Sequence, residues 1–233
     1  MKLVYLKLIL PLFIISTFFG MVFQENIFFD NFIQDSQDEI LSKNSIGIFM
    51  SIFSHNLIIT FLSLIFGTIF GIVPIIGTLI NGLFLGYIIS QYPSITPLLK
   101  ISSYALVEIS AILISFSLGT SLGFERIKHY FKKNKKKKGV IILTIGIIGF
   151  LMIVSNSIIS MLIPLSLEIK LILIILGAIF LAPAIIVFFK FENRKEKKEY
   201  FNKIGKNLII YSKIVIPLLL IAAIIETIAI IIW

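Results

Sequence analysis

Apolar residues in this chain form long runs that are separated by short polar stretches. A helix needs roughly 20 residues to cross a hydrocarbon core of about 30 Å. None of the runs alternates polar and apolar positions as a membrane β-barrel does, and a helix satisfies its own backbone hydrogen bonds in lipid. The pattern predicts an all-α polytopic membrane protein with one membrane domain, residues 1–233. The main runs cover 3–23, 57–90, 101–124, 140–164, 171–189 and 214–233.

The first run and the polar stretch behind it set the start of the topology. A signal peptide is one interpretation of residues 3–23, but the run is long and no small-x-small cleavage site follows, so we expect a helix that stays in the membrane. Residues 24–55 are mostly acidic in their charges and are predicted to form an extracytoplasmic loop. Their second half, 40–53, fits either a short interfacial helix or an ordinary loop.

The run 57–90 is interrupted by Pro74 and contains five glycines. As a helix it would measure about 50 Å, at 1.5 Å per residue. Two full crossings need about 60 Å. We therefore expect a Gly/Pro-interrupted pair of short helices, which either span the membrane as two close-packed segments or form a re-entrant hairpin.

Basic residues indicate the orientation. They gather in two stretches, 125–139 and 190–212, which we expect to be cytoplasmic loops because positive charge is retained on that side. Both stretches fall on the same side as the first lysines only if the run 57–90 returns the chain to the side from which it entered. The sequence thus predicts about seven transmembrane helices, with the N-terminus in, the C-terminus out and a helix pair within 140–189.

Composition narrows the possible functions. The chain is 58% hydrophobic, has a formal charge of +9 and contains no Cys, which excludes disulfides and thiolate chemistry. Its two His, His55 and His129, are too few for a His-built metal centre, so we expect no metal and no cofactor. No Ser-His pairing or zincin motif is present, so we expect no enzyme. The basic stretches suit anionic lipid headgroups, whereas the lack of interleaved aromatic residues argues against nucleic acid.

Two carboxylates, Glu108 and Glu226, lie inside apolar runs. A charge at membrane depth costs roughly 2.5 kcal/mol or more, so such residues usually mark a site or a packing contact. In the predicted topology each lies about seven residues from the outer end of its helix, which is roughly 10 Å of helical rise. We therefore expect both carboxylates at one level, turned towards neighbouring helices. No Lys or Arg lies at this depth, which favours their protonated forms.

Small and polar residues accompany the carboxylates at helical spacing, as expected of a face that contacts protein. Three Gly-xxx-Gly pairs indicate close helix packing or dimerisation, namely Gly67 with Gly71, Gly82 with Gly86, and Gly119 with Gly123. The candidate intramembrane polar site comprises Glu108, Glu226, Asn81, Tyr104, Ser115 and Asn56. Three interpretations of this site stay open: a protonated clamp between helices, a proton- or cation-linked transport site, and a docking cleft for a protein or lipid.

Several segments carry a recognisable pattern. His55-Asn56 precedes the first glycine pair, Asn81 opens an Asn-Gly-x-x-x-Gly segment, Glu108 lies in an x-x-Glu-x-x-Ala segment, and Glu226 closes an Ala-x-x-Glu ending. Together these segments resemble the stage II sporulation protein M family of integral membrane proteins. Where that family has His-Gly, this chain has Tyr104-Ala105, and residues 140–189 add two crossings relative to shorter members.

The resemblance implies a scaffold, because the namesake acts as a membrane scaffold for cell-wall hydrolases during engulfment. We accordingly expect a multi-pass protein of the cell membrane that is a non-enzymatic scaffold or complex subunit, docking partner proteins or lipids through its inner helices. A homodimer or a hetero-complex is expected. The alternative is a transporter or lipid translocator that uses Glu108 and Glu226.

Overall fold

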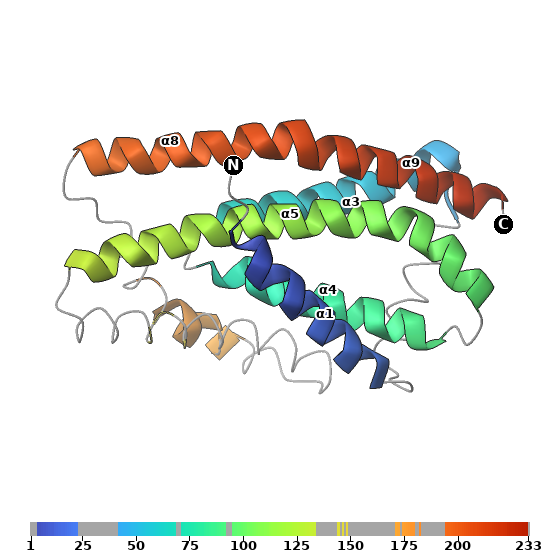
Figure 1. Ribbon diagram of the computed structural model, residues 1–233, viewed down its shortest axis with the longest axis horizontal. Helices are drawn as coiled ribbons and strands as arrows, with labels where there is room; N and C mark the ends of the chain where they lie inside the picture. The colour runs from blue at the N-terminus through green and yellow to red at the C-terminus, as the bar shows by residue number, and fades with distance from the viewer. Residues whose placement is uncertain are drawn as a thin grey trace. The chain divides into compact units, whose positions relative to one another are not determined.

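The described part of the chain is helical throughout. The computed structural model describes residues 4–22, 42–68, 71–91, 95–133 and 194–232, with a few residues between 144 and 182. Helices account for every regular element in these ranges, so the all-α prediction is confirmed there (Figure 1). The main elements are α1 (Leu6–Val22), α3 (Ser45–Phe66), α4 (Ile72–Gln91), α5 (Ile95–Lys133), α8 (Arg194–Ile210), the π-helix η1 (Tyr211–Val215) and α9 (Ile216–Ile232).

Four helical segments in the described ranges are long and apolar enough to cross a membrane. They are 45–66, 72–91, 104–128 and 194–232, and the shorter apolar helix α1 has 17 residues. The expected crossings within 140–189 lie almost entirely outside the described residues. The total of seven crossings and the orientation of the termini therefore stay predictions.

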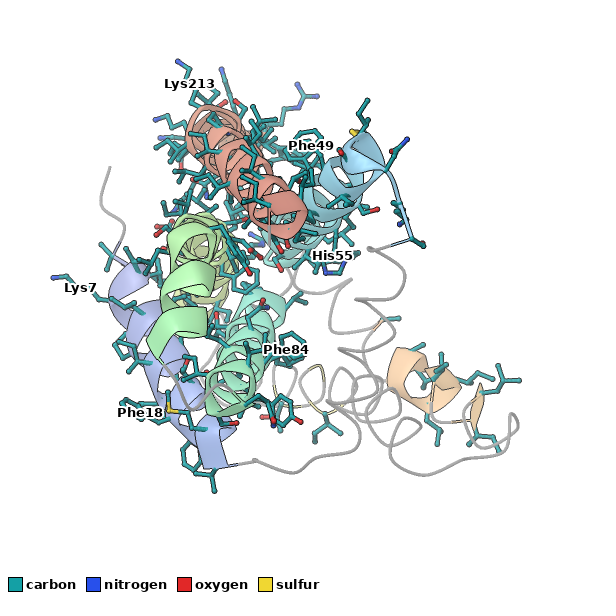
Figure 2. All side chains as sticks on the ribbon, turned by 90° about the vertical axis from the view of Figure 1, so that its right-hand side faces the viewer. Lys7, Phe18, Phe49, His55, Phe84 and Lys213 are labelled. Atoms are coloured by element: carbon teal, nitrogen blue, oxygen red, sulfur yellow. The ribbon has the colours of Figure 1, made fainter. Side chains whose placement is uncertain are left out.

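Large apolar side chains lie on the outside of the helices and small polar side chains lie between them, which is the arrangement expected in lipid. Large apolar side chains such as Phe18 and Phe19 are 65 and 62% exposed, and Phe18 points away from the helices (Figure 2). Thr60, Thr78 and Ser115 are fully buried. Lipid is as apolar as leucine, so small residues rather than large ones gain most from helix contacts. The exposed apolar faces are therefore suited to contact with lipid.

The contacts divide the chain into two compact units, where the sequence predicts one membrane domain. Unit 1 comprises residues 1–124 and 200–233, and unit 2 comprises residues 125–199. Within unit 2, Arg126 near the end of α5 forms an ion pair with Glu196 at the start of α8, with Nη1 2.8 Å from Oε1.

Within unit 1, non-consecutive helices form parallel pairs. On α1 and α4, Gly82 meets the backbone of Phe13, and Gly86 meets the backbone of Thr17 further along both helices. On α3 and α5, Thr60 is bonded to Ser115, and Gly67 meets Gly119 further along both helices. The directions thus alternate from α1 through α3 and α4 to α5, and α9 runs antiparallel to α3 (Figure 1). This alternation is what successive membrane crossings require.

The Gly/Pro-interrupted pair differs from its prediction. Helices α3 and α4 have 22 and 20 residues, so each is long enough to cross the membrane. The break falls at 67–71, and Pro74 lies in the first turn of α4, where a missing N–H costs nothing. The length estimate was too short because α3 begins at Ser45, capped by Asn44, whose Oδ1 accepts from Gly47 N at 2.8 Å.

Segments expected to be loops are helical in their described parts. Residues 45–53 belong to α3 rather than to a separate interfacial helix, and residues 24–41 lie outside the described chain. The predicted basic loops overlap the last turns of α5 and all of α8, which continues through η1 into α9. Lys and Glu are good helix formers, so high charge alone does not end a helix.

Candidate functional site

Three polar side chains from three helices lie near one another inside unit 1. Glu108 on α5 accepts a hydrogen bond from the side-chain amide of Asn56 on α3. Glu226 on α9 lies close enough to Glu108 for the two carboxyl groups to interact electrostatically. All three side chains are partly buried. We call Glu108, Asn56 and Glu226 the carboxylate cluster.

Local packing places α9 against α3 beside this cluster. Ile48, Ile52 and Ala223 form a buried apolar group, and Phe49 stacks on Phe53 at a centroid distance of 5.9 Å. Ala223 is small enough for a close approach of the two helices. Thr227, next to Glu226, is buried and donates to the carbonyl of Ala223 at 2.7 Å, so its hydroxyl is satisfied within α9.

The apolar segments that carry the cluster contain no strongly basic residue. Helix α3 and the segments 101–124 and 214–232 contain no Lys or Arg. Two ionised carboxylates repel each other strongly in a low-dielectric setting. The arrangement can therefore hold a proton on one of the carboxyl groups, or it can hold a bound cation. No group of three His, Asp or Glu suited to a metal occurs among the described residues.

Other residues of the predicted site lie elsewhere. Ser115 is fully buried two turns along α5 and donates to the carbonyl of Thr60 at 2.7 Å, so it joins α5 to α3. Asn81 donates to the carbonyl of Gly77 in its own helix at 2.8 Å. Tyr104 is partly buried one turn before Glu108.

The predicted glycines mark close contacts between backbones. A Cβ on Gly82 or Gly86 would collide with α1, and one on Gly119 would lie 2.5 Å from the carbonyl oxygen of Ser63 on α3. A Cβ on Gly123 would collide with the backbone of Gly71. These glycines therefore contribute to the packing between helices of one chain.

Two glycines differ from the expected pattern. Gly67 follows the last residue of α3, and Gly71 lies in the turn before α4 with φ of +69°, so they are not a pair within one helix. That φ favours Gly because a Cβ is strained there. Sequence reasoning missed Gly20 on α1, where a Cβ would collide with the backbone of Leu83. The spacing from Ser16 to Gly20 is a small-xxx-small signal that could have identified it.

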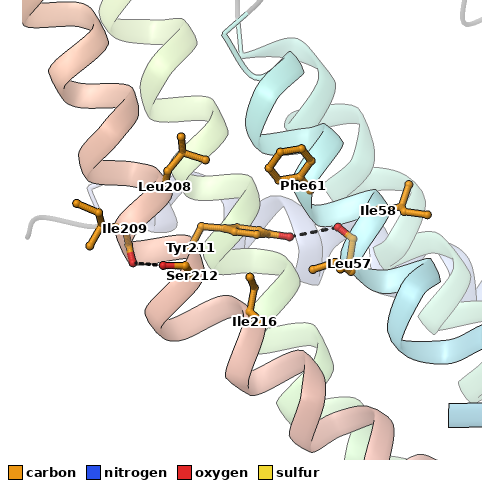
Figure 3. A pocket seen from close by; sticks show the side chains of 8 residues that line it. All are labelled: Leu57, Ile58, Phe61, Leu208, Ile209, Tyr211, Ser212 and Ile216. Carbon is orange, nitrogen blue, oxygen red and sulfur yellow. Dashed lines mark hydrogen bonds between the residues drawn. The ribbon is translucent and has the colours of Figure 1, made fainter. Parts of the chain in front are cut away.

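An apolar groove between α3 and the α8–α9 helix was also missed (Figure 3). Tyr211 lies across it and donates from Oη to the carbonyl of Leu57 at 3.2 Å, while its hydroxyl and that of Thr60 share a 2.9 Å hydrogen bond. The groove has a volume of about 630 Å³. It is lined by Leu57, Ile58, Phe61, Leu208, Ile209, Tyr211, Ser212 and Ile216, which include neither carboxylate.

Comparison with known proteins adds a family. A family model described as stage II sporulation protein M matches residues 9–158. The match includes α1, which the motif resemblance did not use, together with α3, α4, α5 and both Asn56 and Glu108. It stops before α9, so the resemblance of the Ala-x-x-Glu ending around Glu226 stays a prediction. No curated protein and no solved structure is significantly similar to the chain.

Proposed function

The chain belongs to the stage II sporulation protein M family, and from this premise we propose that it is a non-enzymatic scaffold or complex subunit of the cell membrane. It docks partner proteins or lipids through its inner helices, as a homodimer or within a hetero-complex. Four segments able to cross a membrane support the multi-pass setting of this proposal.

The observation that carries the proposal is the hydrogen bond between Asn56 and Glu108. A carboxylate that is bonded to a neighbouring helix acts as a fixed contact, which a scaffold needs to hold a binding surface in one shape. The backbone contacts at Gly86 and Gly119 support the same conclusion, since close glycine packing leaves little room for helices to slide.

A transporter or lipid translocator is the second candidate. The proximity of Glu226 to Glu108 favours it, because paired carboxylates inside a membrane are typical of proton- or cation-coupled sites. In that mechanism the carboxyl groups exchange a proton or cation between the two sides, and a neutral amide cannot replace them.

Glu108→Gln in the full chain distinguishes the two candidates. Gln keeps an oxygen that accepts from Asn56, so a scaffold retains its thermal stability in lipid nanodiscs and the partners recovered from crosslinked membranes. Glu108→Leu removes the acceptor and is expected to lose both. Glu125→Gln, further along α5, is the matched control.

Transport of a solute or a lipid, the activity that the second candidate predicts, can be measured in proteoliposomes. If wild type moves a solute or a lipid between leaflets while folded Glu108→Gln does not, the transporter is correct and the scaffold is wrong. If neither protein supports flux and both recover the same partner, the scaffold proposal is supported.

A further inference from the structure

The apolar groove of Figure 3 lies within unit 1, between α3 and the continuous helix of α8, η1 and α9. Its walls expose large apolar side chains, with Ile58 56%, Phe61 43% and Ile209 55% exposed. Its volume lies in the range of about 300–1,000 Å³ that is usual for ligand pockets. A long apolar molecule would therefore fit along it.

The position of Lys206 places one end of the groove at the basic edge of the hydrocarbon. Asn207, the next residue, donates from Nδ2 to the carbonyl of Leu118 and to the hydroxyl of Ser121, near the basic end of the apolar segment 101–124. The groove-lining residues that follow Lys206 extend from there into the membrane, and Tyr211 among them is bonded to Leu57 in the middle of α3. Lys213 is exposed and projects outwards from the helix (Figure 2), and a long lysine side chain can extend its charged end towards the headgroups. The groove therefore lies in the hydrocarbon, with its basic end at headgroup level.

Positive charge borders the groove without opposing negative charge. Lys206 and Lys213 are exposed and precede the groove-lining residues Ile209 and Ile216 by three positions each, so they lie on the same helix face. No Asp or Glu occurs between 200 and 225 or anywhere in α3. An anionic headgroup is therefore attracted to this rim, at about 1 kcal/mol per basic residue near the surface.

Tyr211 ties the two walls of the groove together. It begins η1, and its hydroxyl is bonded to Leu57 and Thr60 on the opposite wall. These bonds form the floor of the groove and hold α3 beside η1. Single π-helical turns of this kind are frequent at functional sites.

We propose that this groove binds one anionic phospholipid, with the phosphate at Lys206, towards which the side chain of Lys213 extends, and an acyl chain along Phe61, Ile209 and Ile58. The site deepens the lipid part of the proposed function and rests on it for its membrane setting. A neutral lipid lacks the charge that Lys213 attracts. A second copy of the chain presents no acidic residue on α3 or 200–225 to meet these lysines.

Native mass spectrometry of the purified full chain tests the site, after equal exposure to dioleoyl phosphatidylglycerol and dioleoyl phosphatidylcholine. The wild type is expected to retain one phosphatidylglycerol in several-fold excess over phosphatidylcholine. Lys213→Gln and the groove-filling Ile58→Trp are each expected to reduce that retention several-fold. The controls are Lys7→Gln, an exposed lysine on α1, and Leu62→Trp, an exposed residue of α3 outside the groove lining; both retain the lipid.

Three results would overturn the site: equal retention of both lipids, equal loss with Lys7→Gln and Lys213→Gln, or full retention by a folded Ile58→Trp. Thermal unfolding of each variant without added lipid separates loss of binding from loss of folding. Crosslinking that detects a dimer abolished by Ile58→Trp would assign the groove to a second copy instead. None of these results bears on Glu108, so the scaffold proposal is tested independently.

Discussion

Asn56 and Glu108 illustrate how much a residue pattern can predict. The spacing of Glu108 and Glu226 within their apolar runs predicts one common level, and the structure brings the two carboxyl groups within interaction distance. The sequence could not decide that Asn56 rather than Asn81 supplies the amide. That choice depends on the rotation of each helix about its axis: Gly82 and Gly86 turn their side of α4 towards α1, Asn81 bonds within α4, and Asn56 on α3 faces Glu108.

Removing the Asn56 amide tests whether its hydrogen bond to Glu108 stabilises the protein. Asn56→Ala leaves a partly buried carboxyl group without the hydrogen bond that joins it to α3, so we expect a loss of about 1–3 kcal/mol in unfolding free energy. Thermal unfolding in detergent micelles measures it. The matched variant Asn81→Ala breaks a bond within one helix and gains helix propensity, so its loss should stay below about 1 kcal/mol. Equal losses would contradict the role of Asn56.

Helices of this protein pack on one another mainly where a glycine lets two backbones come close. Gly-xxx-Gly spacing in the sequence identifies which residues pack closely, but it does not identify their partners. Gly82 contacts α1, and Gly119 contacts α3, although α1 and α3 are not adjacent in sequence to the helices they meet. Helix ends were predicted less well, since the polar residues around Ser45 and Lys128 continue their helices.

Adding one methyl group at two glycines separates packing from helix propensity. A Cβ on Gly119 would lie 2.5 Å from the Ser63 oxygen, so Gly119→Ala should cost about 1–3 kcal/mol by overpacking. Gly205 lies in α8 with nothing within 4 Å of a Cβ, so Gly205→Ala should stabilise by about 0.5–1 kcal/mol. Thermal unfolding of both variants in the same detergent measures the difference. A stabilising Gly119→Ala would refute close packing of α3 and α5.

The ion pair between Arg126 and Glu196 connects α5 to α8 within unit 2. Arg126 is 3% exposed, so removing its partner leaves a buried guanidinium with one interaction fewer. We expect Glu196→Leu to lower the unfolding temperature, and Arg126→Leu with Glu196→Leu to recover part of the loss. Glu199→Leu, one turn further along α8, is the control. If the double variant is less stable than Glu196→Leu, the buried-charge explanation is wrong.

Charge and run length predict the broad organisation at the scale of the whole molecule. The all-helical character follows from the hydrophobic runs, and the alternation of α1, α3, α4 and α5 agrees with the predicted crossings. Division into two compact units was not predicted, because long-range contacts leave no periodic signal in one sequence. The groove and the π-helix at Tyr211 were missed for the same reason.

The chain has no Cys, which allows its orientation to be measured with single cysteines. We expect a membrane-impermeant maleimide applied to intact cells to label Ser42→Cys, at the start of the α3 side, and not Lys128→Cys, at the basic end of α5. Both positions are exposed, so reactivity is matched. Permeabilised cells should label both. Labelling of Lys128→Cys alone in intact cells would reverse the predicted topology.

The parallel pairs have a consequence for biosynthesis. A nascent chain leaves the ribosome in sequence order, and α1 contacts α4 while α3 contacts α5. The small residues Ser16 and Gly20 on α1 therefore cannot pack until α4 has been translated. Ser63 and Gly67 likewise cannot pack until α5 has been translated. The contacts of α1 and α3 therefore form only after these later helices have been made. Insertion of this protein is thus expected to be delayed and cooperative rather than helix by helix.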